Sequence, residues 1–180
     1  MSRLKEEIAQ TRPFTTTAEE AMLNLMRTAD CLNRAVHREI RKWGITSTQY
    51  NVLRILRGAQ PDGLPCSAIG ERMITAEPDI TRLLARLKAQ KMVRQQRGKS
   101  DRRVVFTQIT PAGLDLLAKM DAPVERMTGE MFGHMAEEDL RRLVSLLEDA
   151  RSRCGDLPHP PTCDGKPGSD TCAAPDARNT

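Results

Sequence analysis

Apolar residues recur at intervals of three and four between residues 17 and 43 of this 180-residue chain. This spacing places them on one stripe of an α-helix of about seven turns. Thr17 followed by Glu20 is typical of a helix start, and Gly44 of a helix end. A helix this long in a small protein usually packs along another long helix, often from a partner subunit. The stripe consists of Met22, Leu25, Met26, Ala29, Leu32, Val36, Ile40 and Trp43.

Shorter helices are predicted between residues 47 and 90. The first begins at Ser47 and ends near Gly58, and the second contains Ile69. The third begins near Pro78, because proline is tolerated in the first turn of a helix. Its apolar positions are Ile80, Leu83, Leu84 and Leu87. Two short helices joined by a turn of about four residues, the second of them basic, are typical of a helix-turn-helix.

A β-hairpin is predicted next, with strands at residues 92–94 and 104–107. Its tip places several cations around Gly98 and one carboxylate, Asp101. Such a tip is unsuited to a core, because charged groups are costly to bury. It suits a polyanion, since arginine stays charged and matches the geometry of phosphate. The cations of the tip are Arg97, Lys99, Arg102 and Arg103.

Two further helices complete the pattern. One begins at Pro111, and we expect Pro123 to kink or divide it. The other spans residues 137–152. A stripe formed by Met120, Met127, Met131 and Met135 suits core or dimer packing better than an effector pocket. The predicted fold class is mainly α with a small β-hairpin wing, a winged helix-turn-helix with long N- and C-terminal dimerisation helices.

Positive charge is concentrated in one part of the chain. The whole sequence carries +4, yet residues 77–103 hold nine cations against three carboxylates, a net charge of +6 in 27 residues. Positive potential gathered on one supersecondary unit is what a phosphate-binding surface requires. A merely solvated face would usually mix the two signs more evenly. We therefore predict DNA binding through Thr81, Arg82, Arg86, Lys88, Arg97, Lys99, Arg102 and Arg103.

These candidates differ in what they are expected to contact. Arg82 and Arg86 lie four residues apart on one helix face, so at least one should reach a base edge or a phosphate. Lys88 and Lys99 are expected to contact the DNA backbone, which carries little sequence information.

Two carboxylates, Glu77 and Asp79, stand where the basic helix should begin. They suit the positive end of a helix dipole. They would also face DNA, where one could accept a hydrogen bond from a cytosine amino group. Helix capping is the favoured interpretation. Because Ala76 occupies a position where a capping hydroxyl is often found, Thr75 is a further candidate for the cap.

The remaining chemistry argues against an enzyme. The chain contains no hydrolase-type or phosphate-loop motif, and its three histidines have no evident catalytic companions. The tail cysteines Cys154, Cys163 and Cys172 are spaced too widely for the tight pairs of a zinc site, so no metal or cofactor is predicted. An odd number of cysteines argues against a disulfide framework. The absence of a signal peptide and of a membrane-spanning apolar run predicts a cytoplasmic protein with no membrane partner.

Several short motifs follow one another in a recognisable order. Asp101 and Arg103 form an Asp-x-Arg pattern, and Ile109-Thr110 follows at the position of a Leu-Thr pair. The other segments are Gly44-Ile45-Thr46, Gln49-Tyr50, Val52-Leu53, Gly70-Glu71-Arg72-Met73, residues 81–87 and Thr110-Pro111-Ala112-Gly113. Together they resemble the MarR (multiple antibiotic resistance regulator) family of bacterial transcription factors, over roughly residues 18–152.

The resemblance implies a homodimer whose first and last helices intertwine while two winged helices grip a pseudo-palindromic duplex. The helix at residues 78–90 would enter the major groove, and the wing tip would reach the adjacent minor groove. Asp101 would then be a structural acid that orients Arg103. The implied function is a sequence-specific transcriptional regulator, more often a repressor, which a small ligand or an oxidant releases from its operator.

The resemblance also divides the chain. We expect a DNA-binding lobe and flanking dimerisation helices inside one domain, preceded by an arm. The last segment is rich in Pro, Gly, Asp and Thr, and it cannot bury enough apolar surface to stay ordered. The expected parts are an arm at 1–16, a winged-helix domain at 17–152 with its lobe at about 45–110 and helices at 17–43 and 111–152, and a disordered tail at 153–180.

Two alternatives stay open. Some members of the family sense peroxides through a cysteine near the first helix, which makes Cys31 and Cys66 candidate redox residues. A buried structural thiol is the favoured interpretation of Cys31. A different class of function is a helical interaction module whose winged helix binds a protein partner. Steep salt dependence of binding to a promoter fragment would separate DNA binding from that class.

Overall fold

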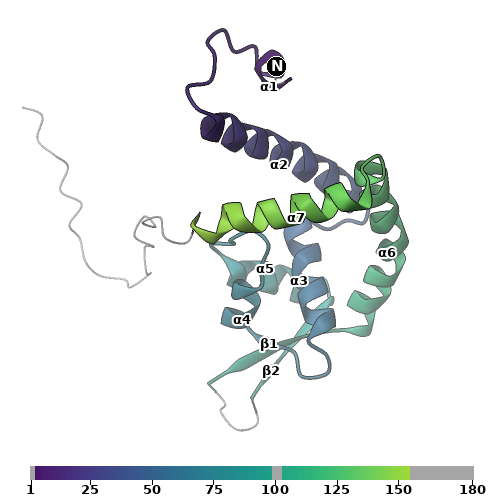
Figure 1. Cartoon of the computed structure of the whole chain (residues 1–180). Coiled ribbons are helices and arrows are strands. Elements are labelled where there is room, and N and C mark those ends of the chain that lie inside the picture. Colours follow the sequence, from purple (N-terminus) through teal and green to yellow (C-terminus); the bar gives the residue numbers. More distant parts are fainter. Residues whose placement is uncertain (1–2, 99–102, 155–180) are drawn as a thin grey trace, which may run out of the picture. The chain divides into compact units, whose positions relative to one another are not determined.

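The computed structural model describes residues 3–98 and 103–154 (Figure 1). The chain forms two compact units, residues 1–131 and residues 132–180, and each is described by itself. The second unit contains α7 (Glu137–Ser152), which occupies the predicted range. The other elements are α1 (Leu4–Glu7), α2 (Thr17–Arg41), α3 (Ser47–Gly58), β1 (Leu64–Pro65), α4 (Cys66–Glu71), α5 (Ile80–Ala89), β2 (Val93–Arg97), β3 (Val105–Ile109) and α6 (Pro111–Phe132). Residues 155–180 of the tail predicted to be disordered lie outside the described residues.

The long helix α2 starts with a side-chain cap one residue earlier than predicted. The Thr16 hydroxyl accepts a hydrogen bond from the Glu19 amide at 3.1 Å. The Glu19 carboxylate in turn accepts from the Thr15 amide at 2.7 Å. The reciprocal pair satisfies backbone donors that a helix end otherwise leaves open.

The N-terminal half of the apolar stripe of α2 is exposed among the described residues of the first unit. Ile40 is fully buried at the C-terminal end of the helix, whereas Met22, Leu25 and Met26 are 56%, 43% and 62% exposed. Large apolar side chains gathered on one exposed helix face are unusual in a monomer and mark an interaction surface. The C-terminal end of α2 is therefore anchored in the lobe, while its first turns are not.

The core of the lobe forms where α3, α4, α5 and the start of α6 meet. Fully buried side chains from these helices are Val52, Leu53, Leu56, Ile69, Leu84, Leu87, Leu117 and Met120. Ile69, Leu84 and Leu87 lie in helices that the sequence predicted, at apolar positions. The helix α3 enters this core through a capping box, in which the Gln49 amide donates to the Thr46 hydroxyl and the Thr46 amide donates to the Gln49 side chain.

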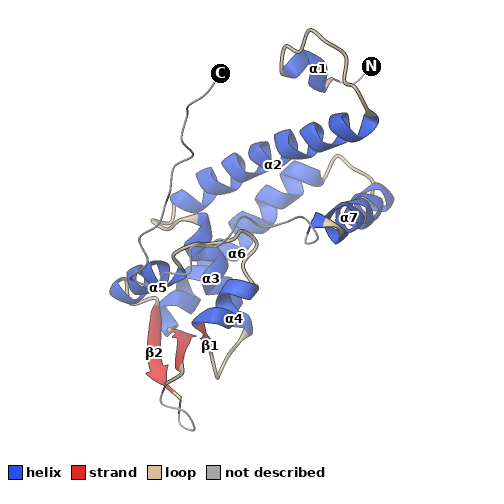
Figure 2. Ribbon diagram, turned by 90° about the vertical axis from the view of Figure 1, so that its left-hand side faces the viewer, coloured by secondary structure: helices blue, strands red, loops and turns tan. Residues whose placement is uncertain are grey.

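Among the described residues, the strands form one antiparallel sheet in the order β1-β3-β2. The sequence prediction missed β1, which pairs Leu64 with Thr107 and Pro65 with Phe106. Pro65 fits there because β1 is an edge strand, where a missing N–H removes no interior hydrogen bond. Gly63 precedes it at φ +74°, and a Cβ there would lie 2.3 Å from the Thr107 carbonyl oxygen. The sheet lies at the end of the lobe opposite α2 (Figure 2).

The hairpin is fastened to α6 around Thr110. The Thr110 amide donates to the Met92 carbonyl at 3.0 Å, and its hydroxyl shares its hydrogen between the carbonyls of Lys91 and Met92. The same hydroxyl accepts from the Gly113 amide at 3.2 Å, which caps the start of α6. A Cβ at Gly113 would lie 2.6 Å from the Met92 carbonyl oxygen. This junction explains why glycine follows three residues after the threonine.

Of the two effects expected at Pro123, a kink or a division, the division is wrong, since α6 continues from Pro111 to Phe132 with Pro123 inside it. Proline removes one backbone hydrogen bond, but the turns on either side keep theirs and the helix continues. The predicted fold class is confirmed as a mostly helical winged helix-turn-helix with a small antiparallel sheet. No helix in the described ranges is long and apolar enough to span a membrane.

Two glycines of α6 should respond in opposite ways to replacement by alanine, because Gly113 lies inside the Thr110 junction and Gly129 lies outside it. Gly113→Ala should lower the free energy of unfolding by about 1–3 kcal/mol, because its methyl group has no room beside the Met92 carbonyl. Gly129→Ala has nothing within 4 Å of the added carbon, so it should raise stability by roughly 0.5–1 kcal/mol. Urea unfolding at one protein concentration measures the two values. Equal stability of the two variants would contradict the close packing at Gly113.

Candidate nucleic-acid interface

The basic helix α5 begins at Ile80, capped by Asp79. One Asp79 carboxylate oxygen accepts a hydrogen bond from the Arg82 amide at 2.9 Å. Capping by Asp79, favoured on the sequence, is confirmed, whereas the start near Pro78 and a cap at Thr75 are wrong. The carboxylate can reach the third amide of the helix from Asp79 itself, so no hydroxyl is needed upstream.

Buried leucines fix the orientation of α5. Leu83, Leu84 and Leu87 are at most 7% exposed and face the core. Helical spacing therefore turns the remaining positions toward solvent. The predicted DNA contacts on this helix, Thr81, Arg82, Arg86 and Lys88, are all exposed.

The helix ends in a tight turn that leads directly into the wing. The Met92 amide donates to the Leu87 carbonyl at 3.0 Å, and the Lys91 amide donates to the Lys88 carbonyl at 2.9 Å. These two bonds form a Schellman motif, in which Lys91 adopts φ +60°. Because β2 begins at Val93, the direction of the wing is set within a few residues of the last turn of α5.

Burial alternates along β3, whereas β2 is buried only at its first residue, Val93. Val93 and Ile109 are opposite one another and buried, as is Thr107 in the same strand. Arg97 is exposed at the end of β2, opposite Val105. The Gly98 amide donates to the Val104 carbonyl at 2.8 Å, so the strands stay paired up to the tip.

Part of the predicted site falls at the tip itself. Arg103 is exposed at the start of the returning chain. Lys99, Arg102 and Asp101 lie outside the described residues. The expectation that Asp101 orients Arg103 therefore stays a prediction.

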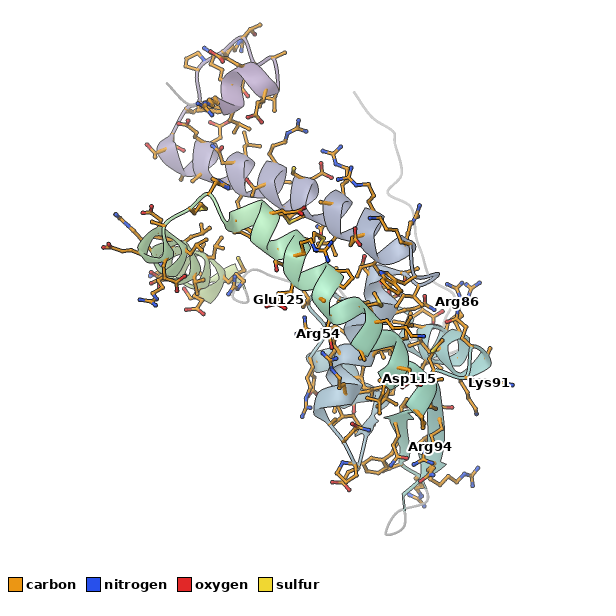
Figure 3. The ribbon with its side chains drawn as sticks, turned by 90° about the vertical axis from the view of Figure 1, so that its right-hand side faces the viewer. Arg54, Arg86, Lys91, Arg94, Asp115 and Glu125 are labelled. Atoms are coloured by element: carbon orange, nitrogen blue, oxygen red, sulfur yellow. The ribbon has the colours of Figure 1, made fainter. Side chains whose placement is uncertain are left out.

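Side-chain hydrogen bonds link the wing to its surroundings, and except for Lys88 they involve residues that were not predicted from the sequence. Arg94 donates to the Gln108 side-chain oxygen at 2.9 Å, across the strand pair. The Gln108 amide group donates to the carbonyls of Pro61 and Asp62, in the turn before β1. On the other side, Lys88 donates to the Gln95 side chain at 3.4 Å. Figure 3 shows Arg86, Lys91 and Arg94 following one another from α5 to the hairpin.

The missed residues extend the cationic surface and brace it. Arg94 adds an exposed cation beside the predicted ones. Gln108 holds both the Arg94 side chain and the loop behind the sheet. Arg94 could have been selected from the sequence by its positive charge. The role of Gln108 could not, because it depends on strand register and on a turn 46 residues earlier in the chain.

The predicted DNA contacts of α5 divide between two grooves. Thr81 and Lys88 line a groove of about 490 Å³ between α5 and β2, together with Ala85, Ala89 and Gln95. Arg82 and Arg86 line a second groove, of about 1080 Å³, on another side of the helix. The predicted shared face of Arg82 and Arg86 is thus confirmed.

The candidate redox residues differ in accessibility. Cys31 is exposed on α2, so the expectation of a buried thiol is wrong for the chain by itself. The reason is that no described residue of the first unit covers this stretch of α2. Cys66 is partly buried against the core at the start of α4. In the described ranges no group of three His, Cys, Asp or Glu residues is arranged to hold a metal ion.

Comparison with known proteins places this geometry in context. Residues 43–104 match the model of the MarR family. The chain is 28% identical over 126 residues to the HTH-type transcriptional regulator MhqR of Bacillus subtilis (strain 168), covering 69% of this chain and 84% of that protein. It is 32% identical over 130 residues to the HTH-type transcriptional regulator TtmR of Methylorubrum extorquens (strain PA1), covering 71% and 65%.

A solved structure is similar over nearly its whole length. The crystal structure of a MarR transcription factor from Planctomyces limnophilus is 36% identical, with a TM-score of 0.59. The match covers 76% of this chain and 98% of that one. Sequence and fold therefore agree on the same class of protein.

The cap at Asp79 predicts that stability depends on the hydrogen-bond acceptor of this side chain and not on its negative charge. Asp79→Ala should lower the free energy of unfolding by about 0.5–2 kcal/mol, whereas Asp79→Asn keeps an acceptor and should stay close to the wild type. Glu77→Ala is the neighbouring control and should change stability by less than about 0.5 kcal/mol. Chemical unfolding at fixed protein concentration gives these values. Equal losses for Asp79→Asn and Asp79→Ala would show that the hydrogen bond is not what matters.

Proposed function

This chain belongs to the MarR family of DNA-binding transcriptional regulators, and from that premise we propose that it is a repressor. In this proposal it acts in the cytoplasm as a homodimer and binds a pseudo-palindromic operator in duplex DNA. The observation that carries the proposal is the exposed row of cations on α5 and the hairpin, with buried leucines behind it. Positive charge gathered on one exposed surface is suited to the phosphate backbone of a duplex.

Each part of the lobe suits one groove of DNA. An exposed helix such as α5 fits the major groove, where base edges can be distinguished. The wing cations Arg97 and Arg103 suit the negative potential of an adjacent minor groove, and we include Lys99 and Arg102 with them. Lys88 suits a phosphate, because it lies beside the wing and carries a point charge.

The exposed apolar face of α2 supports a homodimer. Met22, Leu25 and Met26 need a cover that the described residues of their own unit do not supply. In the second unit, Val144 and Leu146 of α7 are likewise more than half exposed. A second copy offers the same two faces, and closed two-fold pairing is the commonest arrangement of identical chains. Two lobes would then meet two half-sites of one operator.

The proposal also includes a signal that ends repression. A small-molecule effector would act by favouring a dimer whose lobes no longer match the half-sites. An oxidant would act on a thiol, and exposed Cys31 is more accessible than Cys66. Release of DNA by a phenolic ligand, without peroxide, would favour the first trigger, and release by peroxide alone would favour the second.

DNA binding should depend on Arg103. The wild-type protein should retain the DNA upstream of its own gene at low salt, and log Kobs should fall linearly with log salt concentration. Arg103→Ala should lower this affinity at least about tenfold, since one guanidinium contact to a base edge contributes roughly 1–3 kcal/mol. Electrophoretic retention and fluorescence anisotropy measure the two effects. Arg151→Ala, in exposed α7, is the control and should bind as the wild type does.

Two results would count against this function. Failure of the wild-type protein to retain duplex DNA at any salt concentration would exclude the proposal as a whole. Wild-type affinity in folded Arg103→Ala would exclude only the role given to the wing.

Dimer formation should depend on the apolar face of α2. Leu25→Glu should shift the protein from dimer toward monomer in analytical ultracentrifugation, because a carboxylate cannot be buried there without a partner. Thr28→Glu adds the same charge at an exposed polar position of the same helix and should leave the dimer intact. A Leu25→Glu protein that sediments as the wild type does would rule out this face as the interface.

A further inference from the structure

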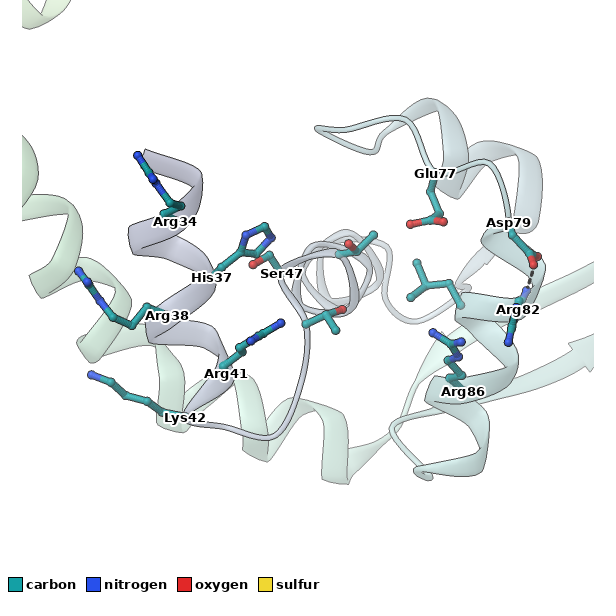
Figure 4. Close-up of a pocket in the computed structure, with 13 residues that line it drawn as sticks. Arg34, His37, Arg38, Arg41, Lys42, Ser47, Glu77, Asp79, Arg82 and Arg86 are labelled. Carbon is teal, nitrogen blue, oxygen red and sulfur yellow. Dashed lines mark hydrogen bonds between the residues drawn. The ribbon is translucent and has the colours of Figure 1, made fainter. Parts of the chain in front are cut away.

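A second cationic surface lies on the side of α5 that carries Arg82 and Arg86. It is a groove of about 1080 Å³ between the C-terminal part of α2, the first turn of α3 and α5 (Figure 4). We propose that this groove binds the phosphate backbone of the DNA duplex beside the base pairs that α5 meets. The inference rests on the proposed DNA binding, and it adds a contact surface on α2 that lies outside the winged helix. The cations of the groove are Arg34, Arg38, Arg41, Lys42, Arg82 and Arg86.

Most of these cations are not neutralised by neighbouring acids. Arg34 is bridged to Asp30 and Lys42 to Glu39, and both pairs lie on α2 itself. No salt bridge among the described residues involves Arg38, Arg41, Arg82 or Arg86. Figure 4 shows Arg41 and Arg86 reaching into the groove from opposite walls. Guanidinium groups that face open solvent without an ion-pair partner are suited to an external anion.

The first turn of α3 closes the back of the groove with further donors. The first amides of a helix have no acceptor inside the helix, and the cap at Thr46 satisfies only the amide of Gln49. The backbone amides of Ser47 and Thr48 therefore have no acceptor within the described part of the chain. The Ser47 hydroxyl is buried and has no hydrogen-bond partner there. An α-helix start of this kind favours a negative charge in front of it. His37, exposed on α2, adds another donor at the same wall.

Two carboxylates also line the groove, and they do not reverse its charge. Asp79 is occupied as the cap of α5, and Glu77 lies on the same side of the groove, across from α2 (Figure 4). With the two bridged cations counted as neutral, four arginines face these two acids, so the local charge stays at +2. Glu77 then limits how deep an anion can enter and favours a phosphate at the α2 side.

The lining of the groove favours a DNA backbone over a small aromatic effector. Apart from Leu83, the lining residues are polar or charged. Small-molecule sites are mostly apolar, with only a few polar groups. A duplex that contacts α5 must continue past it on both sides. The wing meets it on one side, and the guanidinium groups of α2 are the exposed cations on the other.

Arginines of α2 provide a test that leaves α5 and the wing unchanged. The probe is a mixed-sequence DNA duplex, because phosphate contacts do not depend on base sequence. The double variant Arg38→Ala/Arg41→Ala in the full-length protein should bind roughly tenfold more weakly at low salt. The slope of log Kobs against log salt should become shallower by about 0.9 for each lost phosphate contact. Fluorescence anisotropy over a salt series measures the affinity and the slope together.

Matched controls separate this role from a general effect of charge or folding. Arg27→Ala removes a cation from the same helix outside the groove, where it is paired with Glu7 across 3.8 Å, and should keep the wild-type slope. Arg38→Lys/Arg41→Lys keeps the charges and should restore most of the slope. Circular dichroism and sedimentation of each variant show whether the fold and oligomeric state are retained.

The outcomes distinguish this inference from the proposed function. If the wild-type protein binds duplex DNA and the folded double alanine variant has the same affinity and slope, the groove does not contact the backbone. An equal loss in Arg27→Ala would likewise overturn the inference, since it would show an effect of net charge alone. If the wild-type protein binds no duplex, the proposed function and this inference fail together.

Discussion

The carbonyl oxygen of Met92 is the point where the basic helix, the hairpin and the long helix α6 are joined. It accepts hydrogen bonds from the amide and the hydroxyl of Thr110, and Gly113 leaves the space that it occupies. The chain turns from α5 into β2 one residue earlier, at Lys91. The direction of the wing relative to α5 therefore depends on a few bonds at one place. Any DNA surface that uses both elements requires this junction, because its cations sit on either side of it.

The predicted DNA contacts of α5 lie on two sides of the helix. Thr81 and Lys88 turn toward the wing, whereas Arg82 and Arg86 turn toward α2. Positions 81 and 82 are adjacent in the sequence, yet helical geometry rotates them by about 100° from one another. The Asp79 carboxylate stands near the positions where phosphates would bind, and it accepts the capping hydrogen bond from the Arg82 amide. A cationic surface on two sides of one helix follows from this arrangement.

Some elements were predictable because their signals are local. The spacing of apolar residues located α2, α3, α5 and α7, since each helix must turn one stripe toward the core or toward a partner. The motif around Thr110 also carried its information locally, through a hydroxyl and a glycine three residues apart. Two local rules misled. Pro123 did not divide α6, and a position in the middle of an apolar-striped helix did not bury Cys31, because no described residue of the first unit covers it.

The sequence by itself determined the order of helices and hairpin, the family, and which stretch carries the positive charge, because periodicity and charge are properties of neighbouring residues. Only the tertiary structure decided which distant groups meet. The pairing of β1 with β3, the hold of Gln108 on the turn at Pro61, and the groove that brings Arg41 opposite Arg86 all join residues more than 40 positions apart. Such contacts depend on how buried faces pack against one another, and no local pattern along the chain specifies that packing.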